Sequence, residues 1–121
     1  MALHNVLVYG TLRTGKRPTV EVEATMANLG WYPGIKLGGD SKIVCERIEG
    51  VDDAKLAAFD NYECYSEDSP ENSLYVRRRL DNGDWIYKYN GELNPANTIE
   101  SGDWLEFTGE EAGSNAKLAE A

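Results

Sequence analysis

Short apolar runs alternate with polar breaks along this chain, and each run predicts one element. Val6, Leu7 and Val8 form an apolar run that predicts a buried strand near the start of the sequence. Between residues 20 and 26 apolar and polar side chains alternate, which predicts a strand with one solvated face. A short amphipathic helix is the alternative for this segment, but valine and threonine are weak helix formers.

Two further runs flank a Gly-Gly-Asp sequence at residues 38–40. The run at residues 31–37 is apolar but contains Pro-Gly, which permits an edge strand at best. The Gly-Gly-Asp sequence predicts a hairpin-type turn, and residues 42–49 predict the strand that follows it.

The second half of the chain predicts a hairpin. Residues 74–80 and 85–90 indicate its strands, and the Asp-Asn-Gly-Asp sequence at 81–84 is a strong turn signal. Arg77 and Arg79 share one face of the first strand, and charge of this kind is typical of a protected sheet edge.

An aromatic stripe marks the second strand of this hairpin. Trp85, Tyr87 and Tyr89 lie on one face of it. Such a stripe usually packs in a core, but it could equally form the wall of a pocket with hydroxyl groups directed inwards. Tyr87 and Tyr89 are therefore candidate pocket residues.

One helix is predicted after Asp52. Asp52 can cap it, and Val51 and Leu56 have the spacing of a hydrophobic staple. Leu56 and Phe59 mark the buried side of the helix, and Glu63 lies one turn further along that side. The pattern thus places a carboxylate at the end of the helix, next to the core.

Glu63 is a candidate general acid–base. Partial burial beside Phe59, the helix dipole and the acidic neighbours Asp60, Glu67 and Asp68 would all raise its pKa. A carboxyl with a raised pKa can shuttle protons near neutral pH. The alternative is a helix-end glutamate that simply reaches solvent.

The loop between Gly10 and Gly15 is a candidate binding site. Glycines let backbone approach a ligand closely, and the N–H groups of Gly10, Thr11 and Leu12 suit an anion or an oxyanion. Arg13 adds a guanidinium group. The alternative is a strand that ends in a tight turn.

The elements together indicate the α+β class. About six short strands and one main helix predict a small mixed or antiparallel β-barrel with a helix packed on it. Residues 1–108 form the expected domain. Residues 109–121 are small and polar, and we expect them to form a mobile or weakly helical tail.

The composition and net charge of the chain disfavour several classes of function. The chain has 121 residues, of which 41% are hydrophobic, so a single folded domain is expected. The net charge of −9 disfavours nucleic acid and anionic membrane as partners. No apolar run approaches the roughly 20 residues of a membrane span, and we expect no signal peptide, because the first residues lack a basic region.

Cys45 and Cys64 lack the spacing of a metal site, so we expect free thiols, a cytoplasmic location and no bound metal. A thiol enzyme built on Cys64 would need a base, and the chain has one histidine, His4.

An ordered set of motifs resembles the gamma-glutamylcyclotransferase-like superfamily, also called AIG2-like. The motifs are Tyr-Gly-Thr-Leu-Arg-Thr-Gly at 9–15, Phe-Asp-Asn-Tyr-Glu at 59–63, Tyr-Val-Arg at 75–77, Trp-Ile-Tyr-Lys-Tyr at 85–89 and Ser-Gly-Asp-Trp at 101–104. The resemblance covers residues 5–107, which is nearly the whole expected domain.

The resemblance implies a compact α+β fold and a reaction. A γ-glutamyl group would cyclise to 5-oxoproline and release an amine or amino acid, with no metal or nucleotide cofactor. The family's catalytic glutamate corresponds to Glu63, and its substrate-binding loop to Tyr9, Gly10, Thr11, Leu12 and Arg13. Arg13 would either pair with the substrate α-carboxylate or support the fold through a hydrogen bond to backbone.

The chain departs from the family pattern at three points. Cys64 stands where a glycine usually follows the glutamate, Phe59 replaces a common leucine, and no helical insert follows Gly15. The competing function is a non-catalytic module on the same fold that binds a small molecule or a protein. The leaving group and the oligomeric state stay open at this point.

Overall fold

The computed structural model describes residues 2–120, and a five-stranded sheet forms its centre. The strands are β1 (His4–Val8), β2 (Thr19–Asn28), β3 (Pro33–Val51), β4 (Tyr75–Arg79) and β5 (Trp85–Tyr89). The helices are α1 (Asp53–Tyr62), α2 (Trp104–Thr108) and α3 (Ala116–Glu120), and 3₁₀ turns lie at Pro70–Asn72 and Pro95–Asn97.

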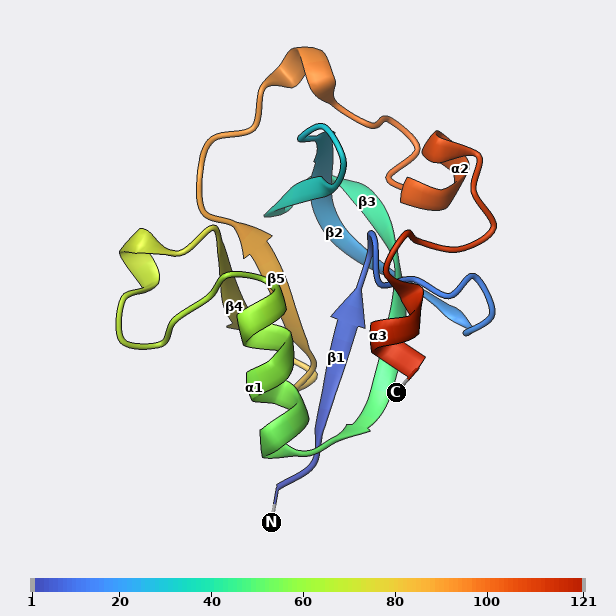
Figure 1. Ribbon diagram of the computed structural model, residues 1–121. Coiled ribbons are helices and arrows are strands. Elements are labelled where there is room, and N and C mark those ends of the chain that lie inside the picture. Colours follow the sequence, from blue (N-terminus) through green and yellow to red (C-terminus); the bar gives the residue numbers. More distant parts are fainter. Residues whose placement is uncertain (1, 121) are drawn as a thin grey trace.

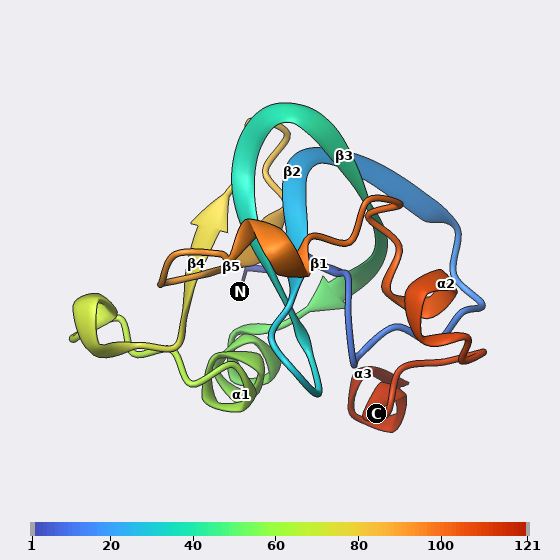
Figure 2. The ribbon, with the colours of Figure 1, turned by 90° about the horizontal axis from the view of Figure 1, so that it is seen from above.

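The sheet has the strand order β2-β3-β1-β5-β4. The central pair β1–β5 is parallel, whereas the other neighbours are antiparallel. The sheet curls into a half-barrel, with α1 in front of it beside β1 and β5 (Figures 1 and 2). The predicted α+β class is confirmed, and the small mixed barrel that the sequence predicts is a five-stranded curled half-barrel with α1 packed on it.

Strand β1 separates two apolar clusters because its side chains alternate between the two faces of the sheet. Leu7 packs in a cluster with Met26. Val6 and Val8 pack in a second cluster with Leu56 of α1. Because apolar side chains pack on both faces of β1, the strand is held firmly in place. The loop that follows β1 therefore starts from a fixed position.

Helix α1 begins as the sequence predicts. The side chain of Asp52 accepts a hydrogen bond from Lys55 N at 2.8 Å, and Val51 and Leu56 are both buried. The helix ends at Tyr62 and is capped by Glu63, whose N–H donates to Phe59 O at 2.9 Å. The cap, the staple and the helix end together set the position of the Glu63 side chain.

The predicted turn at residues 38–40 is wrong. Residues 33–51 form one continuous strand, β3, that bulges away from its partner. Ala24 pairs with Leu37 and Glu23 pairs with Lys42, so residues 38–41 stand outside the regular register. The glycines at 38 and 39 have φ values of 88° and 91°, which lets the strand bend without turning back. The sheet therefore has five strands where the sequence indicates about six.

Two smaller features complete the description of the fold. Residues 104–108 form helix α2, which is capped by Asp103, whose side chain accepts a hydrogen bond from Glu106 N at 3.2 Å. The shared face of Arg77 and Arg79 is confirmed, since both guanidinium groups lie over the Trp85 ring, at 4.5 and 5.1 Å. Within residues 2–120 none of the helices has the length and apolar character to cross a membrane.

Cys64, two residues after the end of α1, has a strained backbone conformation. Cys64 has a φ of 56°, the left-handed conformation that favours glycine, at the position where the family pattern has glycine. We expect Cys64→Gly to raise the free energy of unfolding by about 1 kcal/mol, as measured by urea denaturation. Ala58→Gly, at an exposed position inside α1, is the control and should lower it by about 1 kcal/mol. Destabilisation by both variants would contradict the assigned strain.

Candidate active site

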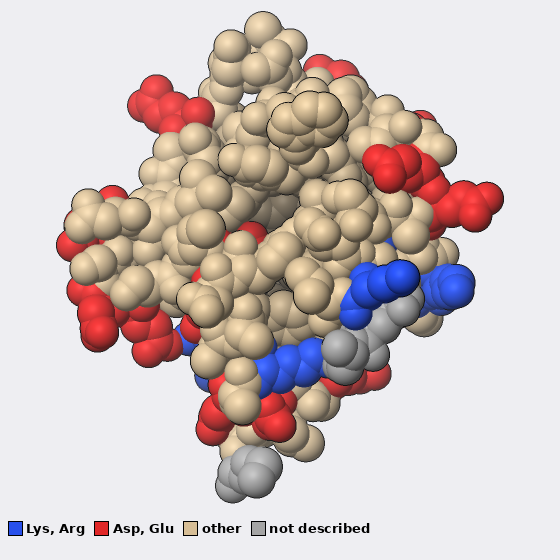
Figure 3. All heavy atoms as spheres, viewed as in Figure 1, with Lys and Arg blue, Asp and Glu red and all other residues tan. Residues whose placement is uncertain are grey.

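A cavity of about 350 Å³ opens beyond the end of β1. Its wall comes from the loop after β1, the β2–β3 turn, the end of α1, strands β4 and β5 and the C-terminal segment. Figure 3 shows the hollow in a largely uncharged part of the surface, with most charged side chains toward the edge of the view. The polar side chains in the wall include Thr11, Tyr62, Glu63, Tyr75 and Asn115.

One buried carboxylate holds the loop after β1 from behind. Glu46 of β3 is fully buried and accepts hydrogen bonds of 2.9 Å from Arg13 Nε, Thr14 N and Gly15 N. The hydroxyl of Thr14 donates a fourth, also at 2.9 Å. Burial alone would raise the pKa of Glu46, but these hydrogen bonds outweigh it and keep the pKa below its usual value.

Arg13 lies behind the loop and does not line the cavity. Its side chain is 5% exposed, and Nη1 donates to Asp103 Oδ1 at 2.8 Å. Two carboxylates, those of Glu46 and Asp103, therefore share one guanidinium. Arg13 acts on the cavity by holding the loop, and its direct contact with a substrate carboxylate stays a prediction.

The loop backbone offers hydrogen-bond donors. Arg13 N donates to Gly10 O at 3.0 Å, which closes a tight turn. Across residues 2–120, no protein group accepts a hydrogen bond from the N–H of Thr11 or Leu12. Successive backbone N–H groups in such a turn form a concavity that suits an anion.

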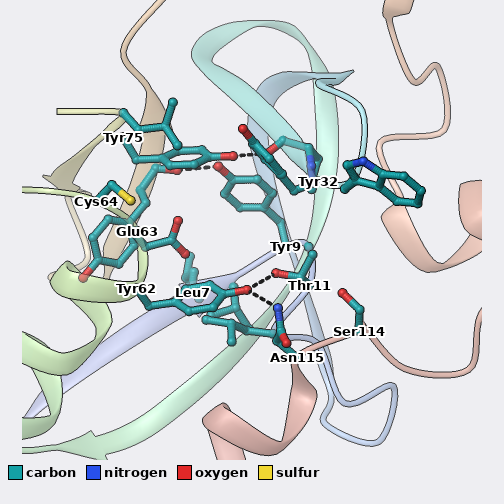
Figure 4. A pocket seen from close by; sticks show the side chains of 17 residues that line it. Leu7, Tyr9, Thr11, Tyr32, Tyr62, Glu63, Cys64, Tyr75, Ser114 and Asn115 are labelled. Atoms are coloured by element: carbon teal, nitrogen blue, oxygen red, sulfur yellow. Dashed lines mark hydrogen bonds between the residues drawn. The ribbon is translucent and has the colours of Figure 1, made fainter.

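Glu63 is the acidic side chain in the cavity wall. Figure 4 shows its carboxyl group directed into the cavity, between Tyr9 and Tyr62. Burial raises the pKa of Glu63 to about 8. The carboxyl group is therefore mostly protonated at neutral pH and can exchange a proton there.

Two of the acidic neighbours expected to raise this pKa, Asp60 and Glu67, are engaged elsewhere. Arg77 Nη1 donates to both carboxylate oxygens of Asp60, at 2.9 and 3.0 Å, and Arg77 Nη2 binds Glu67. Tyr87 lines the cavity, but its hydroxyl donates to Asp60 Oδ1 at 2.5 Å. The charge of Arg77 compensates these carboxylates, so burial is the cause that the structure gives for the shift at Glu63.

Two tyrosine hydroxyls in the wall donate their protons to backbone. Tyr9 Oη donates to Tyr87 O at 2.6 Å, and Tyr75 Oη donates to Pro33 O at 2.5 Å. Burial raises the pKa of both tyrosines, so they stay neutral and offer oxygen lone pairs to a ligand. Tyr89 packs edge-on against Tyr75, with ring centroids 6.0 Å apart, and does not line the cavity.

The C-terminal segment after residue 108 runs along the loop. Gly113 N donates to Arg13 O at 2.7 Å, and Asn115 N donates to Thr11 O at 2.8 Å. A Cβ on Gly113 would collide with the carbonyl oxygen of Thr11 and lie 2.7 Å from that of Gly10. The expected weak helicity appears as α3, and the described part of the segment is docked; its mobility stays a prediction.

A chain of side-chain hydrogen bonds links this segment to α1. Thr11 Oγ1 lies 2.6 Å from Tyr62 Oη, and Asn115 Nδ2 donates to the same hydroxyl at 2.8 Å (Figure 4). Ser114 lines the cavity beside Asn115. The loop, the helix end and the C-terminal segment thus form one connected wall.

The geometry gives the Cys64 thiol no histidine base. Cys64 lines the cavity, whereas His4 lines a different hollow, where its Nε2 lies 2.7 Å from Asp53 Oδ1. His4 Nδ1 accepts a hydrogen bond of 3.3 Å from Trp85 Nε1. In the part of the chain that the structure describes, no three His, Cys, Asp or Glu side chains gather to hold a metal ion.

Sequence reasoning missed several residues of this site. Glu46 has a signal, because it is a carboxylate within an otherwise largely apolar strand. Tyr62 adjoins Glu63 at the helix end, and Tyr75 begins one of the motifs. Asn115 has no local signal, since a polar residue in a polar segment is typical of a solvated loop.

A family model described as "Gamma-glutamyl cyclotransferase, AIG2-like" matches residues 6–106. The chain therefore belongs to the gamma-glutamyl cyclotransferase, AIG2-like family. The matched region contains the loop after β1 and Glu63, and it ends before the C-terminal segment that completes the cavity wall.

Three solved structures share the fold. The uncharacterized protein PH0828 from Pyrococcus horikoshii is 20% identical with a TM-score of 0.60, over 87% of this chain and 92% of that one. YtfP from Escherichia coli is 25% identical with a TM-score of 0.58, over 86% of this chain and 98% of that one. YkqA from Bacillus subtilis is 20% identical with a TM-score of 0.59, over 88% of this chain and 41% of that one. A comparison with curated proteins found no match.

Removing the charge of Glu46 should destabilise the fold. We expect Glu46→Gln to lower the free energy of unfolding by about 3 kcal/mol, because Arg13 would lose a buried counter-charge. Urea denaturation at pH 7 measures this change. Glu23→Gln, at an exposed position of β2, is the matched control and should change stability by less than about 0.5 kcal/mol. Equal effects of the two variants would show that Glu46 does not organise the loop.

The close packing of Gly113 against the loop after β1 leads to a second prediction. Gly113→Ala should lower the free energy of unfolding by about 2 kcal/mol, because its Cβ would push the C-terminal segment off the loop. Thermal denaturation measures the loss, and amide hydrogen exchange at Asn115 should become faster. Glu110→Ala, an exposed change in the same segment, is the control. Unchanged exchange at Asn115 in Gly113→Ala would mean that the segment is not docked as described.

Proposed function

We propose that this protein cyclises a γ-glutamyl group to 5-oxoproline and releases the amine that the group carried. The observation that carries the proposal is the placement of Glu63, a buried carboxyl with a pKa of about 8, in a cavity whose opposite wall is the loop after β1. Membership of the family supports the same reaction class.

Glu63 would transfer the protons of the reaction. Its ionised form accepts a proton from the substrate α-ammonium, and the freed nitrogen attacks the γ-carbonyl carbon of the same molecule. A carbon–nitrogen bond forms within the five-membered ring, and the bond to the leaving nitrogen breaks. The proton held by Glu63 passes to that nitrogen, and the second proton of the attacking nitrogen is released to solvent, so the products are 5-oxoproline, a free amine and one proton.

The loop would bind the anionic part of the substrate. The N–H groups of Thr11 and Leu12 are without a protein acceptor among residues 2–120, and they suit either the α-carboxylate or the developing oxyanion. The lone pairs of the Tyr9 and Tyr75 hydroxyls suit the α-ammonium group. Gly10 lets Pro33 pack closely against the end of β1, where a Cβ would lie 2.7 Å from Pro33 Cγ, and Arg13 contributes by fixing the loop.

The main effect of the cavity would be on the conformation of the bound substrate. The nucleophile and the carbonyl belong to one molecule, so the protein has to fold the glutamyl chain until they approach each other. Well-oriented reactions of this kind reach effective molarities on the order of 10⁵ M or more. Tyr87 supports the wall through its backbone contact with Tyr9, and any effect of Tyr89 would reach the substrate through Tyr75.

Glu63→Gln is the direct test. We expect kcat for 5-oxoproline formation to fall by at least about 10²-fold, because glutamine can neither accept nor return a proton. Folding should be retained, since glutamine resembles the protonated carboxyl that predominates at pH 7. The assay uses a panel of γ-glutamyl amines, γ-glutamyl amino acids and glutathione, with circular dichroism to confirm the fold.

Glu71→Gln, at an exposed position of a 3₁₀ turn, is the control and should retain full activity. Activity retained in folded Glu63→Gln would exclude this role of Glu63. A folded wild-type protein that binds γ-glutamyl compounds without converting any of them would instead indicate a binding module.

The pKa of Glu63 sets the pH dependence. The base is the ionised carboxylate, so kcat/KM should rise with pH, reach half its plateau near pH 8 and fall about tenfold per pH unit below about pH 7. Initial rates of 5-oxoproline formation between pH 5.5 and 9.5 measure the profile. Half-maximal activity near pH 4.5, the ordinary value for a glutamate, would contradict the effect of burial.

A further inference from the structure

Trp31 has a position that the fold does not explain. It is 90% exposed and lines the mouth of the cavity. By contrast, Trp104 is buried and Trp85 stacks with Arg77, at 4.5 Å from the guanidinium carbon to the ring centroid. Exposing a whole indole loses the gain of burying it, so a fully exposed tryptophan beside a cavity indicates contact with a ligand.

The turn between β2 and β3 holds Trp31 at this place. Leu29 N donates to Tyr32 O at 2.9 Å, and Gly30 N donates to the Asn28 side chain, also at 2.9 Å. Gly30 has a φ of 118°, a backbone conformation that glycine adopts readily and other residues rarely adopt. A Cβ at this position would meet nothing within 4 Å. The indole is therefore presented by an ordered turn.

The surroundings of Trp31 are apolar and offer no positive charge. Tyr32 and Leu74 also line the cavity, and Leu74 is 36% exposed. No lysine, arginine or histidine belongs to the described lining of the cavity. A carboxylate on the leaving part of a substrate would meet apolar side chains there, and the net charge of −9 would repel it further.

We infer that Trp31 forms a subsite for the leaving amine and that the preferred amine is uncharged apart from its reacting nitrogen, apolar and aromatic. This inference rests on the proposed cyclisation. The γ-glutamyl part would lie between Glu63 and the loop, and the leaving part would extend to the mouth and stack on the indole. Glutathione and γ-glutamyl amino acids carry a carboxylate on the leaving part and would bind more weakly.

Binding and turnover are measured separately with three probes. Calorimetry on the Glu63→Gln background gives the Kd of γ-glutamylbenzylamide, γ-glutamylmethylamide and γ-glutamylglycine without conversion. Benzylamide should bind tightest and glycine weakest. Adding Trp31→Ala should weaken benzylamide binding about tenfold and change methylamide binding less than about twofold, because only the aromatic ring reaches the indole. Trp31→Phe should restore most of the loss.

Phe107→Ala is the control, because Phe107 is also an exposed aromatic residue, 50% exposed, but lies outside the cavity lining. It should leave all three Kd values unchanged. Equal weakening of benzylamide and methylamide by Trp31→Ala, or γ-glutamylglycine binding as tightly as benzylamide, would overturn the inference.

Formation of 5-oxoproline by the wild-type protein separates the two hypotheses. Turnover without the expected ranking, or without its dependence on Trp31, would overturn the subsite alone. Binding with the expected ranking but no 5-oxoproline from any probe would overturn the proposed reaction while leaving an aromatic subsite at Trp31. No binding of any probe would overturn the subsite.

Discussion

The carboxylate of Glu46 is the point on which the geometry of the cavity depends. A buried charge without partners is strongly destabilising, and here four hydrogen bonds compensate it. Two of the donors are backbone N–H groups, those of Thr14 and Gly15, so the charge fixes main chain as well as side chains. A conformation that turned these groups away would remove two of the four hydrogen bonds that compensate the buried charge of Glu46. The loop after β1 is rigid for this electrostatic reason.

The opposite side of the same loop is held by the C-terminal segment. Gly113 and Asn115 donate to loop carbonyl oxygens, which orients the peptide groups between them. The loop backbone is thus held in place before any ligand arrives, so binding of a ligand to it would require little reorganisation. Structural charges lie behind the loop and around Arg77, while the cavity retains one carboxyl in apolar surroundings. This separation explains how Glu63 can have a high pKa in a protein rich in acidic residues.

Local signals were sufficient for much of this molecule. Helix α1 and its end at Glu63 follow from Asp52 and the staple, which act within a few residues. The hairpin of β4 and β5 follows from its turn. Interactions between distant segments were not readable, because nothing near Arg13 in the sequence indicates that it pairs with a carboxylate 33 residues away. The continuity of β3 was missed for a related reason, since two glycines signal a turn unless a partner strand keeps the chain extended.

The hydrogen bond from Asn115 to the carbonyl of Thr11 joins segments about 100 residues apart. The cavity can therefore form only after segments that are distant in the sequence have come together, whereas the β4–β5 hairpin can form locally. A ligand that fills the cavity would bind the native chain and have no site on a partly folded one. Any compound that occupies the cavity should consequently raise the melting temperature of the whole protein. A thermal-shift screen would then detect ligands of this protein even when their chemical conversion is unknown.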